Sequence, residues 1–463
     1  MKKMLCQIVL VLVLSHLTIQ VAEAFSVALK RQTLIYHEPP HENNLKMSDQ
    51  VIEHYITQRL DNFDHQNNLT FEMRYLTNDI WFKSGGPIFI MIGGEWEISA
   101  GHILPGQHIY DMAKENNGLL LYSEHRFYGK SQPTKTSSTE NLKYLSVEQS
   151  LADLAHLIRV ITSDKEMNAT GGVILVGGSY AATMAAWFKQ KYPHLVKGSW
   201  ASSAPLHAKL NYFEYTETVA ESIRTTGGDK CYNIIEGIFG AIENLIEHND
   251  SESLKTVFKV CDNFDITNIL DVWNFYSTAK DFFSGLVQYG TQNSINSYCK
   301  YLVTGNANAT NDLESLRPFA KSYIDSFLPP NAKCIPISYE DELKQLKKDN
   351  TSVANAFRPW FYQTCSEFGW YQTTDSQKHP FGSKSPVDFY LKMCQDVFGD
   401  VFNNSTFEGN MNHTNDFYGS LHPAVTNVYF THGSLDPWHK MGILDDLNIH
   451  SPSTVIQGIS HCR

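Results

Sequence analysis

A continuous apolar run passes through a glycine-rich turn into a helical pattern between residues 173 and 192. Residues 173–176 predict a buried strand, residues 183–192 predict a helix, and Pro193 ends it. A strand, a sharp turn and a helix in this order hold a serine on a strained backbone with its hydroxyl exposed. Ser179 is therefore a candidate nucleophile, in a relaxed form of the motif, because Ala181 replaces the usual glycine. The alternative interpretation is a glycine-rich turn without chemistry.

The same alternation of strand and helix recurs on both sides of this segment. Residues 87–92 and 118–123 are apolar runs typical of buried parallel strands, and residues 149–161 carry apolar side chains at helical spacing. Strand patterns return at residues 428–431 and 454–456. The chain is therefore expected to form an α/β fold of the α/β-hydrolase class, a mostly parallel sheet with helices on both faces.

The region between residues 206 and 409 has a different character. Apolar residues recur at helical spacing in residues 231–246 and 266–287, and no clear run of buried strands is present. We expect a large helical cap inserted into a discontinuous core. The predicted domains are a signal peptide at 1–24, a hydrolase domain at 25–205 plus 410–463, and the cap at 206–409.

Cysteine usage and the N-terminus indicate the secretory pathway. Six cysteines fall in the cap, and an oxidising compartment would let them form three disulfides whose connectivity the sequence leaves open: Cys231, Cys261, Cys299, Cys334, Cys365 and Cys394. A zinc site is disfavoured because no close Cys-x-x-Cys pair exists. A signal peptide is predicted from Lys2 and Lys3, the apolar residues 4–14 and the small residues before Phe25. The apolar run is too short for a membrane anchor. Glycosylation sequons agree with this location, at Asn68, Asn168, Asn249, Asn308, Asn350, Asn404 and Asn412.

A serine nucleophile needs a histidine base that a carboxylate orients. In this fold class the partners follow in the order serine, acid, histidine. Asp436 comes just after the strand at 428–431, and His461 comes after the strand at 454–456. The long gap after Ser179 is explained by the cap. The plainer alternatives are a turn aspartate before proline and a structural histidine.

The negative charge that develops on a substrate carbonyl oxygen must be met by backbone N–H groups. We expect one donor at Tyr180, directly after Ser179, and another at Gly94 in the loop that follows an early strand. For Gly94 a simple glycine turn is an equal alternative.

Several motifs together resemble one family, the serine peptidases that include lysosomal Pro-Xaa carboxypeptidase, dipeptidyl peptidase II and thymus-specific serine protease. The likeness spans most of the chain and lies in GPIFIMIGGE (86–95), EHRFYGKSQP (124–133), residues 177–193, ASSAP (201–205), Asp436-Pro437-Trp438 and His461. WFYQTCSEFGW (360–370), residues 394–399, His439 and Ser460-His461-Cys462 look most like the thymus-specific branch.

This resemblance implies an exopeptidase that cleaves after proline through an acyl-enzyme. Ser179, Asp436 and His461 fall on the triad positions, and Trp438 is a candidate wall of a proline pocket, with core packing as the equal alternative. Ala182 departs from the glycine that is common in relatives. Relatives also continue past the histidine into a closing helix, so a base two residues before the last residue of this sequence is expected to be poorly oriented.

The alternatives to this peptidase are an inactive secreted binding protein on the same scaffold and an esterase or lipase. A formal charge of -12 and the lack of a basic run argue against nucleic-acid partners, so peptides, proline-containing ones above all, are the expected partners. No cofactor, no metal and no membrane span are expected. Members of the family often form homodimers, although no feature of this sequence indicates one. The sequence does not choose between a secreted and a lysosomal location.

Overall fold

The computed structural model describes residues 50–350 and 356–463; the predicted signal peptide at 1–24 lies outside them. An eight-stranded sheet runs in the order β1-β2-β4-β3-β5-β6-β9-β10. The strands from β4 to β10 are parallel, and β1 and β2 form an antiparallel edge. The strands are β1 (Ile52–Arg59), β2 (Thr70–Asn78), β3 (Ile88–Ile92), β4 (Leu119–Ser123), β5 (Val173–Gly178), β6 (Gly198–Ser202), β9 (Val428–Gly433) and β10 (Ser453–Ile456).

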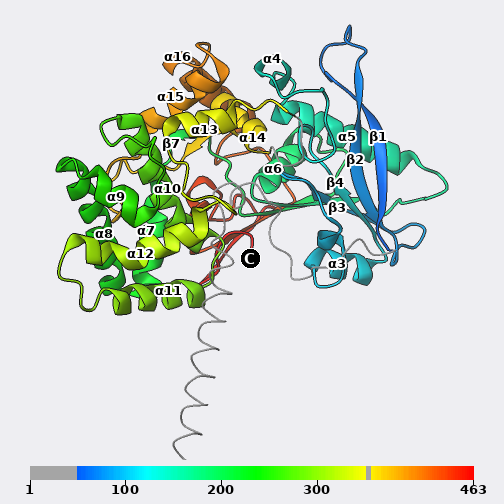
Figure 1. The fold of residues 1–463 in the computed structure, drawn as a ribbon. Coiled ribbons are helices and arrows are strands. Elements are labelled where there is room, and N and C mark those ends of the chain that lie inside the picture. Colours follow the sequence, from blue (N-terminus) through cyan, green and yellow to red (C-terminus); the bar gives the residue numbers. More distant parts are fainter. Residues whose placement is uncertain (1–49, 351–355) are drawn as a thin grey trace, which may run out of the picture.

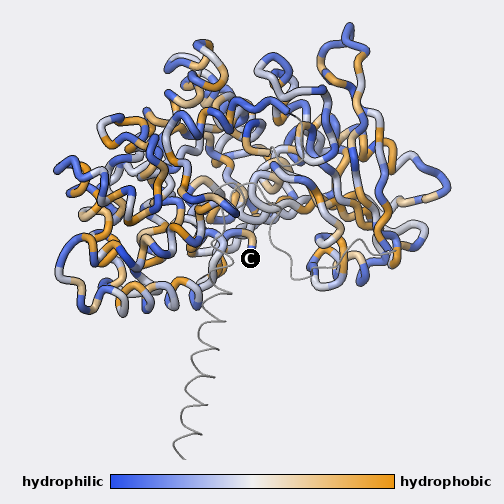
Figure 2. The backbone as a smooth tube through the Cα atoms, viewed as in Figure 1, coloured by the Kyte–Doolittle hydropathy of each residue, from blue (hydrophilic) through white to orange (hydrophobic). Residues whose placement is uncertain are grey.

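The centre of the sheet is apolar, and helices pack against it. Every residue of β4 is buried, and four of the five in β3 are; these strands are coloured mainly as hydrophobic in Figure 2. Helix α6 packs on β5 and β6, α5 contacts α6, and α3 lies against β3 and β4. The helices of this part are η1 (Ala100–Ile103), α3 (His108–Asn116), α4 (Thr139–Leu142), α5 (Val147–Ser163), α6 (Tyr180–Lys191) and η3 (His439–Met441). The mostly parallel α/β core predicted from the sequence is confirmed.

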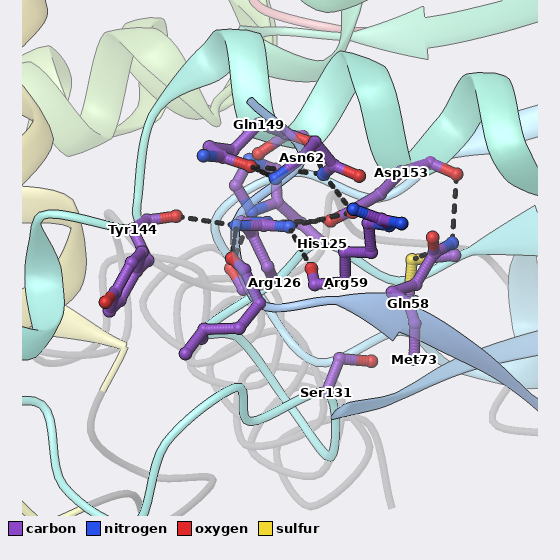
Figure 3. A network of polar contacts seen from close by, with 12 residues as sticks. Gln58, Arg59, Asn62, Met73, His125, Arg126, Ser131, Tyr144, Gln149 and Asp153 are labelled. Atoms are coloured by element: carbon purple, nitrogen blue, oxygen red, sulfur yellow. Dashed lines mark hydrogen bonds and ion pairs between the residues drawn. The ribbon is translucent and has the colours of Figure 1, made fainter. Parts of the chain in front are cut away.

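A buried ion pair joins the antiparallel edge to this core. Arg126, which is fully buried, donates from Nε and Nη2 to both carboxylate oxygens of Asp153 on α5, at 2.7 and 2.8 Å. Its Nη1 also donates to the carbonyl of Tyr144 at 2.8 Å, and its Nη2 to that of Arg59, the last residue of β1 (Figure 3). Asn62 adds a hydrogen bond to Asp153 at 2.9 Å. The network fixes the end of β1 against α5.

A helical cap fills the region between β6 and β9, and it forms the green to orange part of Figure 1. Three disulfides lie within it, Cys231–Cys299, Cys261–Cys334 and Cys365–Cys394. The helical, disulfide-bearing cap is thereby confirmed, while the exact domain boundaries stay predictions. Its elements are β7 (Lys209–Asn211), α7 (Phe213–Gly227), α8 (Asp229–Glu247), α9 (Ser251–Phe258), α10 (Ile269–Gln288), α11 (Gln292–Gly305), α12 (Asp312–Phe327), α13 (Tyr339–Leu346), α14 (Phe357–Gln363), η2 (Thr364–Phe368), β8 (Gly369–Tyr371), α15 (Val387–Phe398) and α16 (Asn404–Tyr418).

The loops at the carboxyl ends of the parallel strands meet the cap. Tyr212, which precedes α7, donates its hydroxyl to the carbonyl of Pro437 at 2.6 Å, in the loop after β9. Crevices at this end of a parallel sheet are where α/β proteins bind ligands. Over the residues that the structure describes, no helix is long and apolar enough to cross a membrane.

Candidate active site

Ser179 occupies a sharp turn between β5 and α6. Its backbone has φ 60° and ψ -132°, a region that side-chain-bearing residues rarely adopt and that stores strain. Gly177 makes the turn possible, because a Cβ there would lie 2.3 Å from the carbonyl oxygen of Ala181. Ala182, where relatives commonly have glycine, is accommodated with no exposed surface, and its N–H donates to the carbonyl of Ser179 at 2.9 Å.

Asp436 and His461 form a buried pair. Nδ1 of His461 lies 2.9 Å from Oδ1 of Asp436, which also accepts the N–H of Trp438 at 2.9 Å. Asp436 is fully buried and His461 is 5% exposed. Burial disfavours the imidazolium, but the Asp436 carboxylate, with a further contribution from Cys462, outweighs that cost and holds the pKa of His461 well above its ordinary value. The carboxylate thus fixes the ring and favours its protonated form.

Backbone and side-chain contacts hold the His461 loop on both sides. The N–H of His461 donates to the carbonyl of Gln288 at 3.2 Å, and the Ser460 hydroxyl donates to the same oxygen at 3.0 Å. The next residue, Cys462, donates its N–H to the hydroxyl of Ser203 at 3.0 Å. The expectation of a poorly oriented histidine is therefore wrong: hydrogen bonds to a cap helix and to the loop after β6 fix its backbone.

Ser179 opens onto the cavity between the core and the cap. Trp438 lines this cavity with it, and the rings of Trp438 and His461 are 6.3 Å apart. No hydrogen bond joins the Ser179 hydroxyl to His461, and Nε2 of His461 has no partner within the described part of the chain. Catalytic hydrogen bonds often form only once substrate is bound. In the neutral form of His461, with its proton on Nδ1, the unpartnered Nε2 is the atom that can accept a proton.

Of the two expected oxyanion donors, Tyr180 lines the cavity and Gly94 does not. Tyr180 is the first residue of α6, so its N–H has no partner inside the helix and is available to a ligand. Its side chain is anchored away from that function, with its hydroxyl 3.0 Å from Nε2 of His125 and 2.9 Å from Nε2 of Gln363. Gly94 packs under Trp96, because a Cβ on Gly94 would lie 2.7 Å from that ring. Gly94 is not among the residues that line the cavity.

Aromatic side chains form much of the cavity wall. The ring of Trp438 lies 5.9 Å from that of Trp370 and 5.4 Å from that of Tyr215, and both of these residues line the cavity. Trp438 therefore packs against other aromatic side chains and also forms part of the cavity wall. The other aromatic residues of the wall are Tyr180, Tyr289, Phe327, Phe357, Trp360, Phe361, Tyr371, Phe389 and Tyr390. Within the described residues, no group of three His, Cys, Asp or Glu side chains is arranged to hold a metal ion.

Glu95 is a residue of this site whose side chain sequence reasoning missed. It follows Gly93 and Gly94 after β3, lines the cavity together with Ser179, and is 6% exposed. Its Oε2 has no hydrogen-bond partner within the described residues, and burial raises the pKa of Glu95 to about 7. The Gly-Gly-Glu motif after a buried strand predicts a backbone donor, whereas the burial of the Glu95 side chain depends on the tertiary fold.

The asparagines of the predicted glycosylation sites are exposed: Asn68, Asn168, Asn249, Asn308, Asn350, Asn404 and Asn412. They are accessible to a transferase in this fold, and their modification stays a prediction.

Comparison with known proteins identifies the family. The model of the family "Serine carboxypeptidase S28" matches residues 58–463. A candidate serine protease of Caenorhabditis elegans is 31% identical over 89% of this chain and 83% of its own length. The thymus-specific serine protease of Mus musculus is 31% identical over 88% and 81%. The lysosomal Pro-X carboxypeptidase of Bos taurus is 26% identical over 98% and 91%. The chain belongs to the serine carboxypeptidase S28 family of serine peptidases.

Proposed function

We propose that this protein is an exopeptidase that cleaves peptide bonds after proline, with Ser179 as nucleophile, His461 as base and Asp436 as the residue that orients it. One observation carries the proposal: the buried His461–Asp436 hydrogen bond of 2.9 Å leaves Nε2 of His461 without a partner among the described residues, and the His461 ring lies 6.3 Å from that of Trp438, which lines the cavity together with Ser179. The strained backbone of Ser179 supports it, since strain of this kind is retained where function requires it.

The reaction proceeds through two acyl transfers. Nε2 of His461 takes the proton of the Ser179 hydroxyl as its oxygen attacks the substrate carbonyl, and the N–H of Tyr180 donates to the resulting oxyanion. The protonated His461 then gives the proton to the leaving amine. Water, deprotonated by the same histidine, hydrolyses the acyl-enzyme and restores the Ser179 hydroxyl. Asp436 keeps the tautomer with the proton on Nδ1 throughout.

The preference for proline rests on the aromatic wall and on a relative. The bovine relative is named as a Pro-X carboxypeptidase. A pyrrolidine ring is compact and apolar and donates no N–H, so it suits a pocket walled by Trp438, Trp370 and Tyr215. The cap above the cavity admits peptides and unfolded chain ends and excludes folded proteins.

A location in the secretory pathway, lysosomal or extracellular, fits the three disulfides and the exposed sequons. The lysosomal name of the bovine relative agrees with it. A homodimer is proposed on the family resemblance alone.

Labelling with a fluorophosphonate probe tests the nucleophile. We expect the folded protein to be labelled at Ser179 and Ser179→Ala to remain unlabelled. Absence of label on folded protein would favour the inactive binding protein. A library of peptides with and without proline then tests the substrate class: turnover of acyl esters with no peptide cleavage would identify an esterase instead.

A further inference from the structure

The cavity at Ser179 carries acidic side chains and no basic ones. Glu95 from the core, Asp281 on α10 and Glu342 on α13 line it. None of the described residues that line it is Lys, Arg or His. When these acidic groups are ionised, such a lining favours cations over carboxylates.

Glu95 is an acidic group of the cavity with one carboxylate oxygen, Oε2, that has no hydrogen-bond partner among the described residues. Only 6% of the Glu95 surface is exposed, and its Oε2 accepts no hydrogen bond from the described residues. Asp281 differs, because Nζ of Lys280 lies 2.8 Å from its Oδ1 and balances part of its charge. A buried carboxylate oxygen without a donor is costly in free energy and is rare in folded proteins.

Glu95 also lies next to the proposed catalytic groups. Its carboxylate interacts electrostatically with His461. Burial is the main cause that raises the pKa of Tyr289, another residue of the cavity wall, and the Glu95 carboxylate raises that pKa further. A ligand group that reached Glu95 would therefore be held within the same cavity as the Ser179 hydroxyl.

We propose that Glu95 binds an ammonium group of the substrate, so that the enzyme selects peptides by a positive charge close to the cleaved bond. This rests on the proposed peptidase function and narrows it: the group recognised is an amine and not the α-carboxylate of a C-terminus. An ammonium donates three hydrogen bonds and would satisfy the unpaired Oε2. A C-terminal carboxylate at the same place would meet a like charge whenever Glu95 is ionised, and no Lys, Arg or His among the described residues lines the cavity to bind it.

The pKa of Glu95, raised to about 7 by burial, supports this assignment. Burial makes the lone carboxylate unfavourable, and an adjacent cation reverses that effect. Occupation of the site by an ammonium would thus convert a destabilised group into a buried, hydrogen-bonded ion pair.

Two sources provide an ammonium: the α-amine of a peptide N-terminus and the side chain of lysine. We would measure peptide binding by calorimetry to the full chain carrying Ser179→Ala, which cannot turn substrate over. The probes are Ala-Pro-Ala amide, its N-acetyl form, N-acetyl-Lys-Pro-Ala amide, and N-acetyl-Ala-Pro-Ala with a free carboxylate. They carry, in turn, an α-amine, no charge, a side-chain ammonium and a carboxylate.

We expect at least one ammonium-bearing peptide to bind about tenfold or more tightly than the uncharged one, the scale of one charge-assisted hydrogen bond. Adding Glu95→Gln should reduce that ratio to about threefold or less. Glu97→Gln removes the same charge two residues away, outside the cavity lining, and should keep the ratio.

Equal or tighter binding of the carboxylate peptide, or no binding by either ammonium peptide, would overturn the proposal. An unchanged ratio in Glu95→Gln would overturn the role of Glu95 itself. If Glu95→Gln fails to fold, the ratio in the Ser179→Ala background still decides for or against an ammonium site. This outcome is separate from that of the fluorophosphonate test, because peptide binding is measured on the Ser179→Ala variant, which has no Ser179 hydroxyl.

Discussion

The carbonyl oxygen of Gln288 accepts the N–H of His461 at 3.2 Å, so the last turn of a cap helix holds the backbone of the proposed base. The side chain of Gln288 extends this link. Its Oε1 accepts from the Tyr215 hydroxyl at 2.6 Å and from Nε1 of Trp438 at 3.1 Å. Cap helices α7 and α10 and the loops that carry Asp436 and His461 therefore form one hydrogen-bonded unit.

Replacement of Gln288 by alanine should lower kcat about tenfold and change KM less. The variant leaves the buried donors of Tyr215 and Trp438 without an acceptor and loosens the loop that orients His461. Steady-state kinetics on a proline-containing peptide would measure both constants. Gln345→Ala, the same change at an exposed position of α13, is the matched control. An unaltered kcat in Gln288→Ala would show that the side chain has no positioning role.

Replacement of Asp436 by asparagine should lower kcat/KM by on the order of 10³ to 10⁴, because the amide favours the wrong tautomer of His461. The direction in which the kcat/KM profile shifts with pH also follows from the structure. The carboxylate holds the pKa of His461 above its ordinary value, so its loss should move the acid limb of the kcat/KM profile to lower pH. Asp445→Asn, at an exposed site nearby, provides the control. A limb that moved to higher pH would contradict the assigned pair.

The buried strands were predictable because each is a continuous apolar run between turn residues. β3, β4, β5, β9 and β10 all begin and end within two residues of the predicted runs. The hairpin of β1 and β2 was not predicted, because β1 is mainly exposed or half-buried and its sequence IEHYITQR has no apolar run. Its position depends on Arg126, a contact between residues far apart in the chain.

The site was predictable where one chain segment defines it. The elbow at Ser179 and the loops at Asp436 and His461 each follow a strand, and strand ends meet at one edge of a parallel sheet. Gln288 and Glu95 were not identified as site residues. Gln288 belongs to the cap, and only the tertiary fold brings α10 to His461. Glu95 became significant through its burial and its missing partner, which no local pattern encodes.

Removal of the Asp153 carboxylate should strongly destabilise the protein. Asp153→Ala leaves the fully buried Arg126 guanidinium without a counter-charge, which costs about 3–5 kcal/mol. Urea unfolding would measure the change. Asp164→Asn, at an exposed residue just after α5, should alter stability by less than about 1 kcal/mol. If Asp153→Ala were as stable as the parent, the pair would have no structural role.

Five buried groups make opposing contributions to the pH dependence of stability. Burial raises the pKa of Glu95, Glu124 and Glu367 to about 7 from 4.5, so the folded state binds more protons than the unfolded state between these values. Their contribution to stability falls as pH rises through that window. Burial lowers the pKa of His125 to about 3 and of His432 to about 4, so their contribution falls as pH drops below 6.5.

The opposing slopes place the greatest stability near pH 5, and the unfolding free energy should be lower at pH 8 than at pH 5. Glu95→Gln isolates one contribution, because a glutamine at this site has no charge to bury. The loss of stability between pH 4.5 and pH 7 should be smaller in this variant by on the order of 3 kcal/mol. Glu97→Gln should retain the slope of the parent protein. Urea unfolding at several pH values would test this, and equal slopes in Glu95→Gln and parent would mean that Glu95 titrates as an exposed residue does.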